Sequence, residues 1–315
     1  MNQRRPDLPQ LELCARDLCV SYDDSFALEL PYLNLHGRII AVIGHNGSGK
    51  STLIKSILGL LPPKTGELAA SFQQNGESTL LIPEKHMAFS PETGAVFADV
   101  PVESYIKLWC RIKCDRANYY RKEGSHYIER LDIQPLLKKL GRELSKGQRR
   151  RVQSVVGFLS QPKLFLFDEP FDGLDIAQSN QLSNLMLEES RRMTMIVSSH
   201  RMEVVERMAD LVIVLERGKV ITYGTVEEVC AVLCGQSVLI TDSGLSTDDI
   251  LPALQEHFFS CLVSSIGSEV SITGSEIDLE ALYELLHRLK CEGAKLKVVR
   301  PSLVDAMQYH LKKLH

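Results

Sequence analysis

The segment from residue 44 to residue 52, Gly-His-Asn-Gly-Ser-Gly-Lys-Ser-Thr, constrains the fold of this chain more than any other part. It fits the pattern G-x-x-x-x-G-K-[ST], in which glycines let successive backbone N–H groups turn inward around anionic oxygens. The apolar run 38–43 before it predicts a buried strand, and the run 52–58 after it predicts a helix with an apolar face. These flanking elements favour a phosphate-binding loop over a glycine turn that precedes a helix by chance.

Each residue of this loop has a chemical task under that interpretation. The helix N-terminus adds a partial positive charge aimed at the phosphates. Lys50 would reach the β- and γ-phosphates of a nucleotide, and the Ser51 hydroxyl would ligate Mg²⁺. The nucleotide-binding residues predicted here are Gly44, His45, Asn46, Gly47, Ser48, Gly49, Lys50, Ser51 and Thr52.

A second predicted strand ends in two carboxylates. The run 164–167, Leu-Phe-Leu-Phe, is followed by Asp168 and Glu169. Asp168 is positioned to hold Mg²⁺, and Glu169 is the candidate general base that activates water. A solvated acidic pair is the alternative, and the order and spacing relative to the phosphate loop favour the catalytic interpretation.

Between these two sites, residues 144–148 read Leu-Ser-Lys-Gly-Gln and resemble LSGGQ, the signature of the ATP-binding cassette family, with Lys146 in place of the first glycine. The resemblance implies that Ser145 and Gly147, with Lys146 and Gln148 beside them, open a helix aimed at the γ-phosphate of an ATP held by a second subunit. One signature and one phosphate loop per chain imply a dimer, expected to be a homodimer, with two composite sites.

Three further positions resemble nucleotide contacts of the same family. Tyr22 lies where the family stacks an aromatic ring on adenine, although an ordinary strand tyrosine is the alternative. Glu92 stands in for the glutamine of the family's glutamine loop, which implies contacts with nucleotide and metal. Residues 171–175 match the family's D-loop, which implies that Asp175 lies at the site, and Asp172 replaces the usual serine there.

His200 follows the apolar run 195–199, which predicts a strand with a histidine at its tip. A lone histidine is commonly structural, but at this position the resemblance implies a switch histidine that contacts the γ-phosphate. The run 209–220 looks like the family's closing hairpin, so the resemblance covers residues 11 to about 232. It implies an α/β P-loop ATPase with a mostly parallel sheet core, an antiparallel β subdomain and a helical subdomain that carries the signature.

Composition bounds the remaining possibilities. With 315 residues the chain can bury one large core and one small one, and 44% apolar with 24% charged residues is typical of a globular protein. A net charge of −4 gives no general attraction to nucleic acid, and the run 149–151 of three arginines predicts a solvated helix face rather than a polyanion site. No stretch approaches the ~18 apolar residues of a membrane span, and residues 1–7 do not resemble a signal peptide.

The eight cysteines include two pairs with a spacing of four, Cys110/Cys114 and Cys230/Cys234. On a helix each pair shares a face, so a metal site is conceivable. Neither pair has a nearby histidine or a second cysteine pair, which favours buried reduced thiols in a cytosolic protein.

The pattern of elements predicts two domains, residues 11–234 and residues 235–315. The segment 100–143 is helical in pattern, and its apolar stripe of Tyr105, Leu108, Trp109 and Ile112 predicts core rather than a substrate site. After residue 234, alternating short strands and helices predict a small α+β domain without visible chemistry. Its tail, 300–307, resembles the closing element of exporter-type cassette ATPases.

The leading hypothesis is the ATPase subunit of an exporter-type transporter, which uses ATP and Mg²⁺ and drives a separately encoded membrane permease. Such a subunit would be cytoplasmic and peripheral on the membrane, and no nucleic-acid partner is expected. The alternatives are a soluble cassette ATPase with a non-membrane partner such as an iron–sulfur assembly system, a nucleic-acid-associated cassette protein, and a protein that only binds ATP. The residues identify neither the cargo nor the role of the C-terminal domain.

Overall fold

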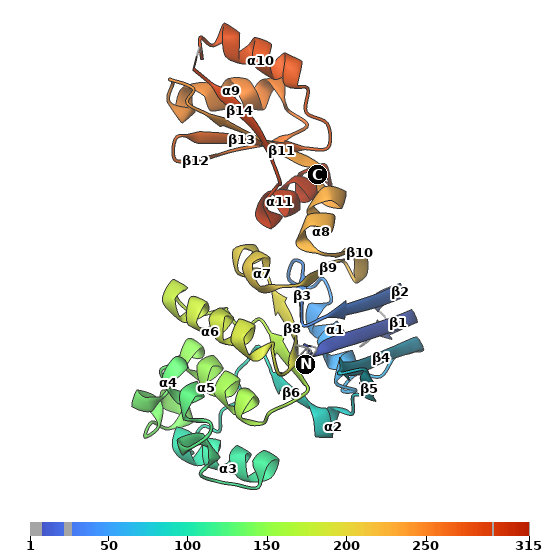
Figure 1. The fold of residues 1–315 in the computed structure, drawn as a ribbon, viewed down its shortest axis with the longest axis vertical. Coiled ribbons are helices and arrows are strands. Elements are labelled where there is room, and N and C mark those ends of the chain that lie inside the picture. Colours follow the sequence, from blue (N-terminus) through green and yellow to red (C-terminus); the bar gives the residue numbers. More distant parts are fainter. Residues whose placement is uncertain (1–7, 22–26, 292, 315) are drawn as a thin grey trace, which may run out of the picture. The chain divides into compact units, whose positions relative to one another are not determined.

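The computed structural model describes residues 8–21, 27–291 and 293–314, and it divides into two compact units that meet between Tyr223 and Gly224 (Figure 1). The predicted boundary between residues 234 and 235 remains a prediction. Each unit has a sheet and a core of its own.

The described part of the first unit is built on one ten-stranded sheet, in the order β5-β4-β1-β2-β10-β9-β3-β8-β7-β6. Strands β9, β3, β8, β7 and β6 are joined by parallel pairings, whereas β5, β4, β1 and β2 pair antiparallel. The strands are β1 (Gln10–Ser21), β2 (Ala27–Gly37), β3 (Ile39–Ile43), β4 (Thr65–Gln74), β5 (Glu77–Leu80), β6 (Met87–Ser90), β7 (Leu164–Asp168), β8 (Thr194–Ser199), β9 (Leu211–Glu216) and β10 (Lys219–Gly224). The predicted α/β class, with a mostly parallel core and an antiparallel part, is confirmed.

The parallel strands separate two hydrophobic cores. In β7, Leu164 and Leu166 point into a core shared with β1, β2 and α1, whereas Phe165 and Phe167 point into a core shared with the helices. This alternation makes the strand apolar on both faces, as a central parallel strand requires. At Gly157 of α5 a Cβ atom would lie 1.9 Å from the Phe165 ring, so only glycine lets this helix approach the sheet.

The helices of the first unit include a cluster formed by α3, α4 and α5 (Figure 1). The α-helices are α1 (Lys50–Ile57), α2 (Pro83–His86), α3 (Val102–Cys114), α4 (Ser125–Arg130), α5 (Lys146–Leu159), α6 (Ile176–Glu189) and α7 (Met202–Met208). Short 3₁₀ turns lie at Tyr119–Arg121 (η1), Gln134–Leu136 (η2) and Gly141–Glu143 (η3). The predicted helical subdomain is therefore present and carries residues 144–148.

Part of the core predicted on α3 is wrong. Tyr105 is buried and Trp109 packs against the core, but Leu108 is 42% exposed and Ile112 is 59% exposed. The buried stripe of the helix is centred on Val102, Ile106 and Cys110, so the other two side chains fall outside it.

The second unit is a small α+β fold, as predicted. Its elements are α8 (Val226–Leu233), β11 (Gln236–Thr241), α9 (Thr247–His257), β12 (Leu262–Ile266), β13 (Glu269–Gly274), α10 (Leu279–Arg288), β14 (Lys295–Val299) and α11 (Leu303–Leu314). The order β-α-β-β-α-β and the antiparallel sheet β12-β13-β11-β14 are those of a split βαβ, ferredoxin-like arrangement. Its core joins Val238 and Ile272 of the sheet to Leu254 of α9 and Leu282 of α10.

The cysteines are free thiols. Cys234 donates to the carbonyl oxygen of Cys230 at 3.2 Å, and the half-buried Cys114 donates to that of Leu159 at 3.0 Å. Burial raises the pKa of Cys110 to about 11 and that of Cys234 to about 12, so both are protonated at neutral pH. Within the described ranges, no helix combines the length and apolar character needed to cross a membrane.

Candidate nucleotide site

The phosphate loop connects β3 to α1 and depends on glycine at two positions. A Cβ atom on Gly44 would lie 2.2 Å from the carbonyl oxygen of Leu215 on the neighbouring strand β9, so no side chain fits there. Gly49 has a φ of +108° and begins helix α1 in a left-handed conformation, which glycine adopts without strain. The predicted loop, with Thr52 buried in the first turn of α1, thus has the strand–loop–helix context that its sequence requires.

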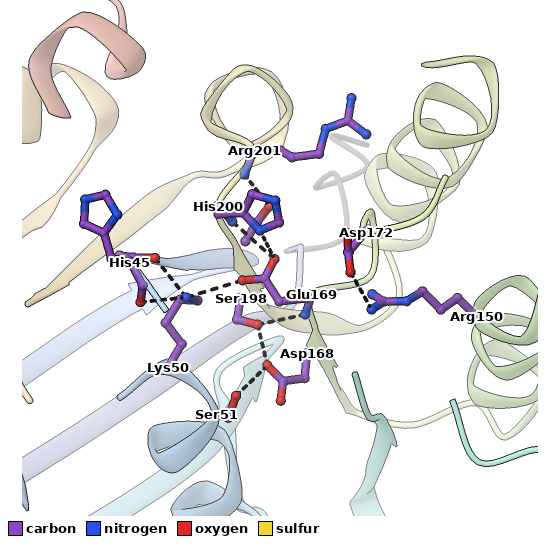
Figure 2. Close-up of polar contacts among 12 residues, drawn as sticks. His45, Lys50, Ser51, Arg150, Asp168, Glu169, Asp172, Ser198, His200 and Arg201 are labelled. Carbon is purple, nitrogen blue, oxygen red and sulfur yellow. Dashed lines mark hydrogen bonds and ion pairs between the residues drawn. The ribbon is translucent and has the colours of Figure 1, made fainter. Parts of the chain in front are cut away.

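The Lys50 ammonium lies across this loop (Figure 2). Its Nζ donates to the carbonyl oxygens of Gly44 at 2.8 Å and His45 at 3.2 Å, and lies 3.4 Å from Oε1 of Glu169. The residue is only 5% exposed. A cation held in a desolvated loop and facing one carboxylate is suited to bind the oxygens of a phosphate chain.

Ser51 and Asp168 meet, as the sequence predicts for two Mg²⁺ ligands. The Ser51 hydroxyl donates to Oδ1 of Asp168 at 3.1 Å, and the Ser198 hydroxyl of β8 donates to the same oxygen at 2.7 Å (Figure 2). Asp168 is 4% exposed, and a hard carboxylate beside a hydroxyl fits the oxygen ligands that Mg²⁺ prefers. Glu92, in contrast, is exposed and makes none of these hydrogen bonds within the described part of the chain.

Glu169 is held by the end of β8. Its Oε2 lies 2.9 Å from Nδ1 of His200 and accepts from the His200 amide at 3.3 Å, and its own amide donates to the Ser198 hydroxyl at 2.9 Å. Its φ of +50° is a left-handed conformation that a non-glycine residue seldom adopts, and backbone strain of this kind gathers at functional sites. Lys50, Asp168, Glu169 and His200 therefore converge on one point (Figure 2).

The signature residues do not join this cluster. Ser145 is the N-cap of α5: its hydroxyl accepts from the Gln148 amide at 3.2 Å, and the Gln148 side chain accepts from the Ser145 amide at 3.1 Å. Asp175 is likewise the N-cap of α6 and accepts from the amide of Gln178 at 2.7 Å. No hydrogen bond or ion pair of the described residues joins 145–148 to the phosphate loop of the same chain. Tyr22 lies outside the described residues.

The prediction that the arginine run 149–151 forms a solvated face is wrong. Arg150 is 1% exposed and Arg151 is 5% exposed, because α5 is covered by neighbouring elements of the helical subdomain. Arg151 donates to the carbonyl oxygen of Leu131 at 3.0 Å, and Nη2 of Arg150 lies 3.3 Å from Oδ2 of Asp172. Burial lowers the pKa of Arg150, opposed by the nearby carboxylates, first that of Asp172.

Sequence reasoning also missed Ser198. Its hydroxyl contacts both the Asp168 carboxylate and the Glu169 amide, so it sets the two acidic residues relative to one another. The signal was present, because Ser198 and Ser199 are polar residues that directly follow the apolar residues 195–197 of the same buried strand.

The fold and this site define a P-loop ATPase of the ATP-binding cassette class. Residues 33–172 match the family model described as ABC transporter, and this stretch holds the phosphate loop, the signature, Asp168 and Glu169 of an ATP-hydrolysing domain. An uncharacterized ABC transporter ATP-binding protein of Bacillus subtilis, YhaQ, is 27% identical over 287 residues, which cover 90% of this chain and 91% of that protein. The molybdenum import ATP-binding protein ModC of Brucella suis is 27% identical over 287 residues, covering 88% of this chain and 76% of its own.

Among solved structures, the ATP-binding subunit of an ABC transporter superposes with a TM-score of 0.59 at 27% identity. The match covers 69% of this chain and 91% of that chain. This match supports the predicted fold class, an ATP-binding cassette ATPase domain.

Proposed function

We propose that this chain is the ATPase subunit of an exporter-type transporter, in which two copies close over two ATP molecules and drive a separate membrane permease. One observation carries the proposal. Lys50, Asp168, Glu169 and His200 form one cluster, while Ser145, at the N-terminus of α5, makes no hydrogen bond or ion pair with these four residues in the described part of the chain. A second copy that presents its α5 N-terminus to the γ-phosphate would complete each site.

Within each site each residue would have a separate role. Lys50 would exchange its carbonyl contacts for β- and γ-phosphate oxygens, and Ser51 with Asp168 would hold Mg²⁺, which supplies charge neutralisation on those oxygens. Glu169 would take a proton from the attacking water, and His200, whose Nδ1 contacts Glu169, would contact the γ-phosphate and fix the carboxylate. The N-terminus of the partner's α5 would add a partial positive charge.

An exposed apolar surface supports a protein partner on the helical subdomain. Leu108 and Ile112 lie one turn apart on α3 and are 42% and 59% exposed, and Phe97, whose ring packs edge-on against Tyr105, is 49% exposed. We assign this surface to the permease, which would place the chain on the cytoplasmic face of the membrane. The relative ModC is named as the ATP-binding protein of an import system.

Two features support export. Residues 300–307 resemble the closing element of exporter-type cassette ATPases, and Glu92 stands at the glutamine position, as in many exporter-type members. The direction of transport can be measured in vesicles that contain the reconstituted transporter with its ATPase subunits on the outside. An exporter accumulates cargo from a cell extract inside the vesicles when ATP is added outside, and cargo that leaves preloaded vesicles instead would show import.

Dimer closure is tested with Glu169→Gln, which keeps the shape of the side chain and removes the base. We expect ATP to bind, turnover to fall by at least about a hundredfold, and an ATP-bound dimer to accumulate. Light scattering with and without ATP measures the dimer, and released phosphate measures turnover. A variant that hydrolyses ATP at a near-normal rate would contradict the role of Glu169, and a monomer in excess ATP would contradict closure.

A further inference from the structure

Two residues that depart from the family's usual pattern contact each other. Lys146 replaces the first glycine of the signature, Asp172 replaces the serine of the D-loop (residues 171–175), and Nζ of Lys146 lies 2.5 Å from Oδ2 of Asp172. Together they form an ion pair between the N-terminus of α5 and the loop that follows Glu169.

A buried cation approaches the same carboxylate from inside the protein. Nη2 of Arg150, one turn along α5 from Lys146, lies 3.3 Å from Oδ2 of Asp172 (Figure 2). The Arg150 side chain is 1% exposed, and its Nε and Nη1 atoms have no hydrogen-bond partner among the described residues. Asp172 is thus the main carboxylate contact of the buried Arg150 guanidinium. A buried cation without a carboxylate partner is strongly unfavourable, so Arg150 depends on Asp172.

Backbone packing joins the same two segments. A Cβ atom on Gly147 would lie 2.5 Å from the carbonyl oxygen of Gly173, and one on Gly173 would lie 3.6 Å from the Lys146 side chain. The signature and the D-loop of one chain therefore touch through their backbones. The Asp172 amide also donates to the carbonyl oxygen of Glu169 at 3.2 Å, which ties the D-loop to the catalytic carboxylate.

We propose that Asp172 is a positioning residue that holds the D-loop against the N-terminus of α5 through Lys146 and Arg150, so that the signature and Glu169 move as one body. A signature that meets the partner's nucleotide would then shift the catalytic carboxylate of its own subunit, three residues before Asp172. The inference rests on the proposed function, because that proposal assigns α5 to the partner's nucleotide.

The first test is hydrogen exchange of the full chain without added nucleotide. Asp172→Asn keeps the shape of the side chain and removes its charge, and we expect amides of 145–148 and of 171–175 to exchange about tenfold faster together. Asp172→Glu keeps the charge and should restore most of the protection. Asp99→Asn is the matched control: Asp99 pairs with Arg142 on the surface of the same subdomain and should leave both segments unchanged.

The second test separates positioning from binding. We expect Asp172→Asn to lower kcat by about tenfold while the KM for ATP stays within about threefold, because Lys50 and its loop are untouched. Lys146→Met should lower kcat less, since Lys146 is the exposed arm of the pair. The double variant should resemble Asp172→Asn alone rather than the product of the two effects.

Several results would overturn the inference: exchange that changes in only one segment, additive effects of the two substitutions, or a kcat of Asp172→Asn within about twofold of wild type. If Asp172→Asn does not fold, Lys146→Met decides by exchange, because it leaves Arg150 its carboxylate. Exchange does not require dimers. If both segments exchange faster together in a protein that does not form composite sites, the proposed function is wrong and the coupling through Asp172 stands. If composite sites form but the two segments do not exchange faster together, the coupling is wrong and the proposed function stands.

Discussion

The Glu169 carboxylate lies between the Lys50 ammonium and the His200 ring. Oε1 faces Lys50 at 3.4 Å without a hydrogen bond, and Oε2 faces His200 at 2.9 Å. If Lys50 binds the nucleotide as proposed, phosphate oxygens would compete with Oε1 for its ammonium, so nucleotide binding would weaken the Lys50 contact of Glu169 and leave the His200 contact. Under the proposed function, the carboxylate would then keep its contact with His200 and face the water that it is proposed to deprotonate.

At this scale Lys50→Ala tests the phosphate loop. The change removes the ammonium that lies 3.4 Å from Oε1 of Glu169 and that would bind phosphate oxygens, and we expect ATP affinity to fall by roughly ten- to a hundredfold, as for loss of a charge-assisted bond of about 1.5–3 kcal/mol. Isothermal titration with ATP measures it. The control is Lys219→Ala, an exposed lysine 3.7 Å from Glu29, which should leave affinity unchanged. Equal affinities for wild type and Lys50→Ala would contradict the assignment.

Among elements, α3 is fastened to the turn η1 by one carboxylate. Glu103 of α3 accepts from the Tyr120 hydroxyl at 2.5 Å and is ion-paired with Arg121. The Tyr120 hydrogen bond, followed by that of Arg121, lowers the pKa of Glu103 to about 2 from 4.5. Because the folded protein binds this proton less readily than the unfolded chain, the contact stabilises the fold fully above pH 4.5 and is lost as pH falls toward 2.

Replacement of Glu103 by Gln should therefore reduce the loss of unfolding free energy between pH 5 and pH 2.5. We expect wild type to lose more stability than Glu103→Gln between pH 5 and pH 2.5, and the two to converge at the lower pH. Urea unfolding at a series of pH values measures the difference. Glu123→Gln, at the exposed pair with Arg116, serves as the control. Parallel pH profiles for wild type and Glu103→Gln would mean that the carboxylate does not hold the two elements together.

Much of the fold at this scale was predictable from sequence, for a physical reason. Strand β7 is apolar along its whole length because both faces are covered, and the loop after β3 needs glycine at each tight turn, so both are visible in the residues alone. Arg150 was expected to be exposed and Ile112 to be buried, and both predictions were wrong. The residue pattern of a helix shows which side chains share a face, but not which neighbouring elements cover that face. The catalytic roles of Asp168 and Glu169 beside the phosphate loop were expected from the order and spacing of the motifs along the chain, whereas Ser198 and the Lys146–Asp172 pair depend on contacts between distant segments.

On the scale of the whole molecule, the composite-site proposal makes a prediction about mixtures. Lys50→Ala damages the phosphate loop, and Ser145→Arg places a bulky side chain at the exposed N-cap of α5, away from the chain's own Lys50. In a homodimer of either variant both sites are ruined. In a mixed dimer both lesions fall on one site, and the other site has an intact loop and an intact signature.

Mixing inactive preparations of the two variants should therefore restore ATPase activity. If chains exchange freely, half of the dimers are mixed and each has one working site, so activity should rise to about one quarter of wild type. Phosphate release measured across mixing ratios should peak at equal amounts, and a Lys50→Ala/Ser145→Arg double variant mixed with either parent is the control that should stay inactive. A Ser145→Arg protein that hydrolyses ATP normally as a monomer would show that each subunit carries a complete site of its own. A mixture that stays inactive, although light scattering and differently tagged chains show mixed dimers, would mean that turnover requires both sites at once.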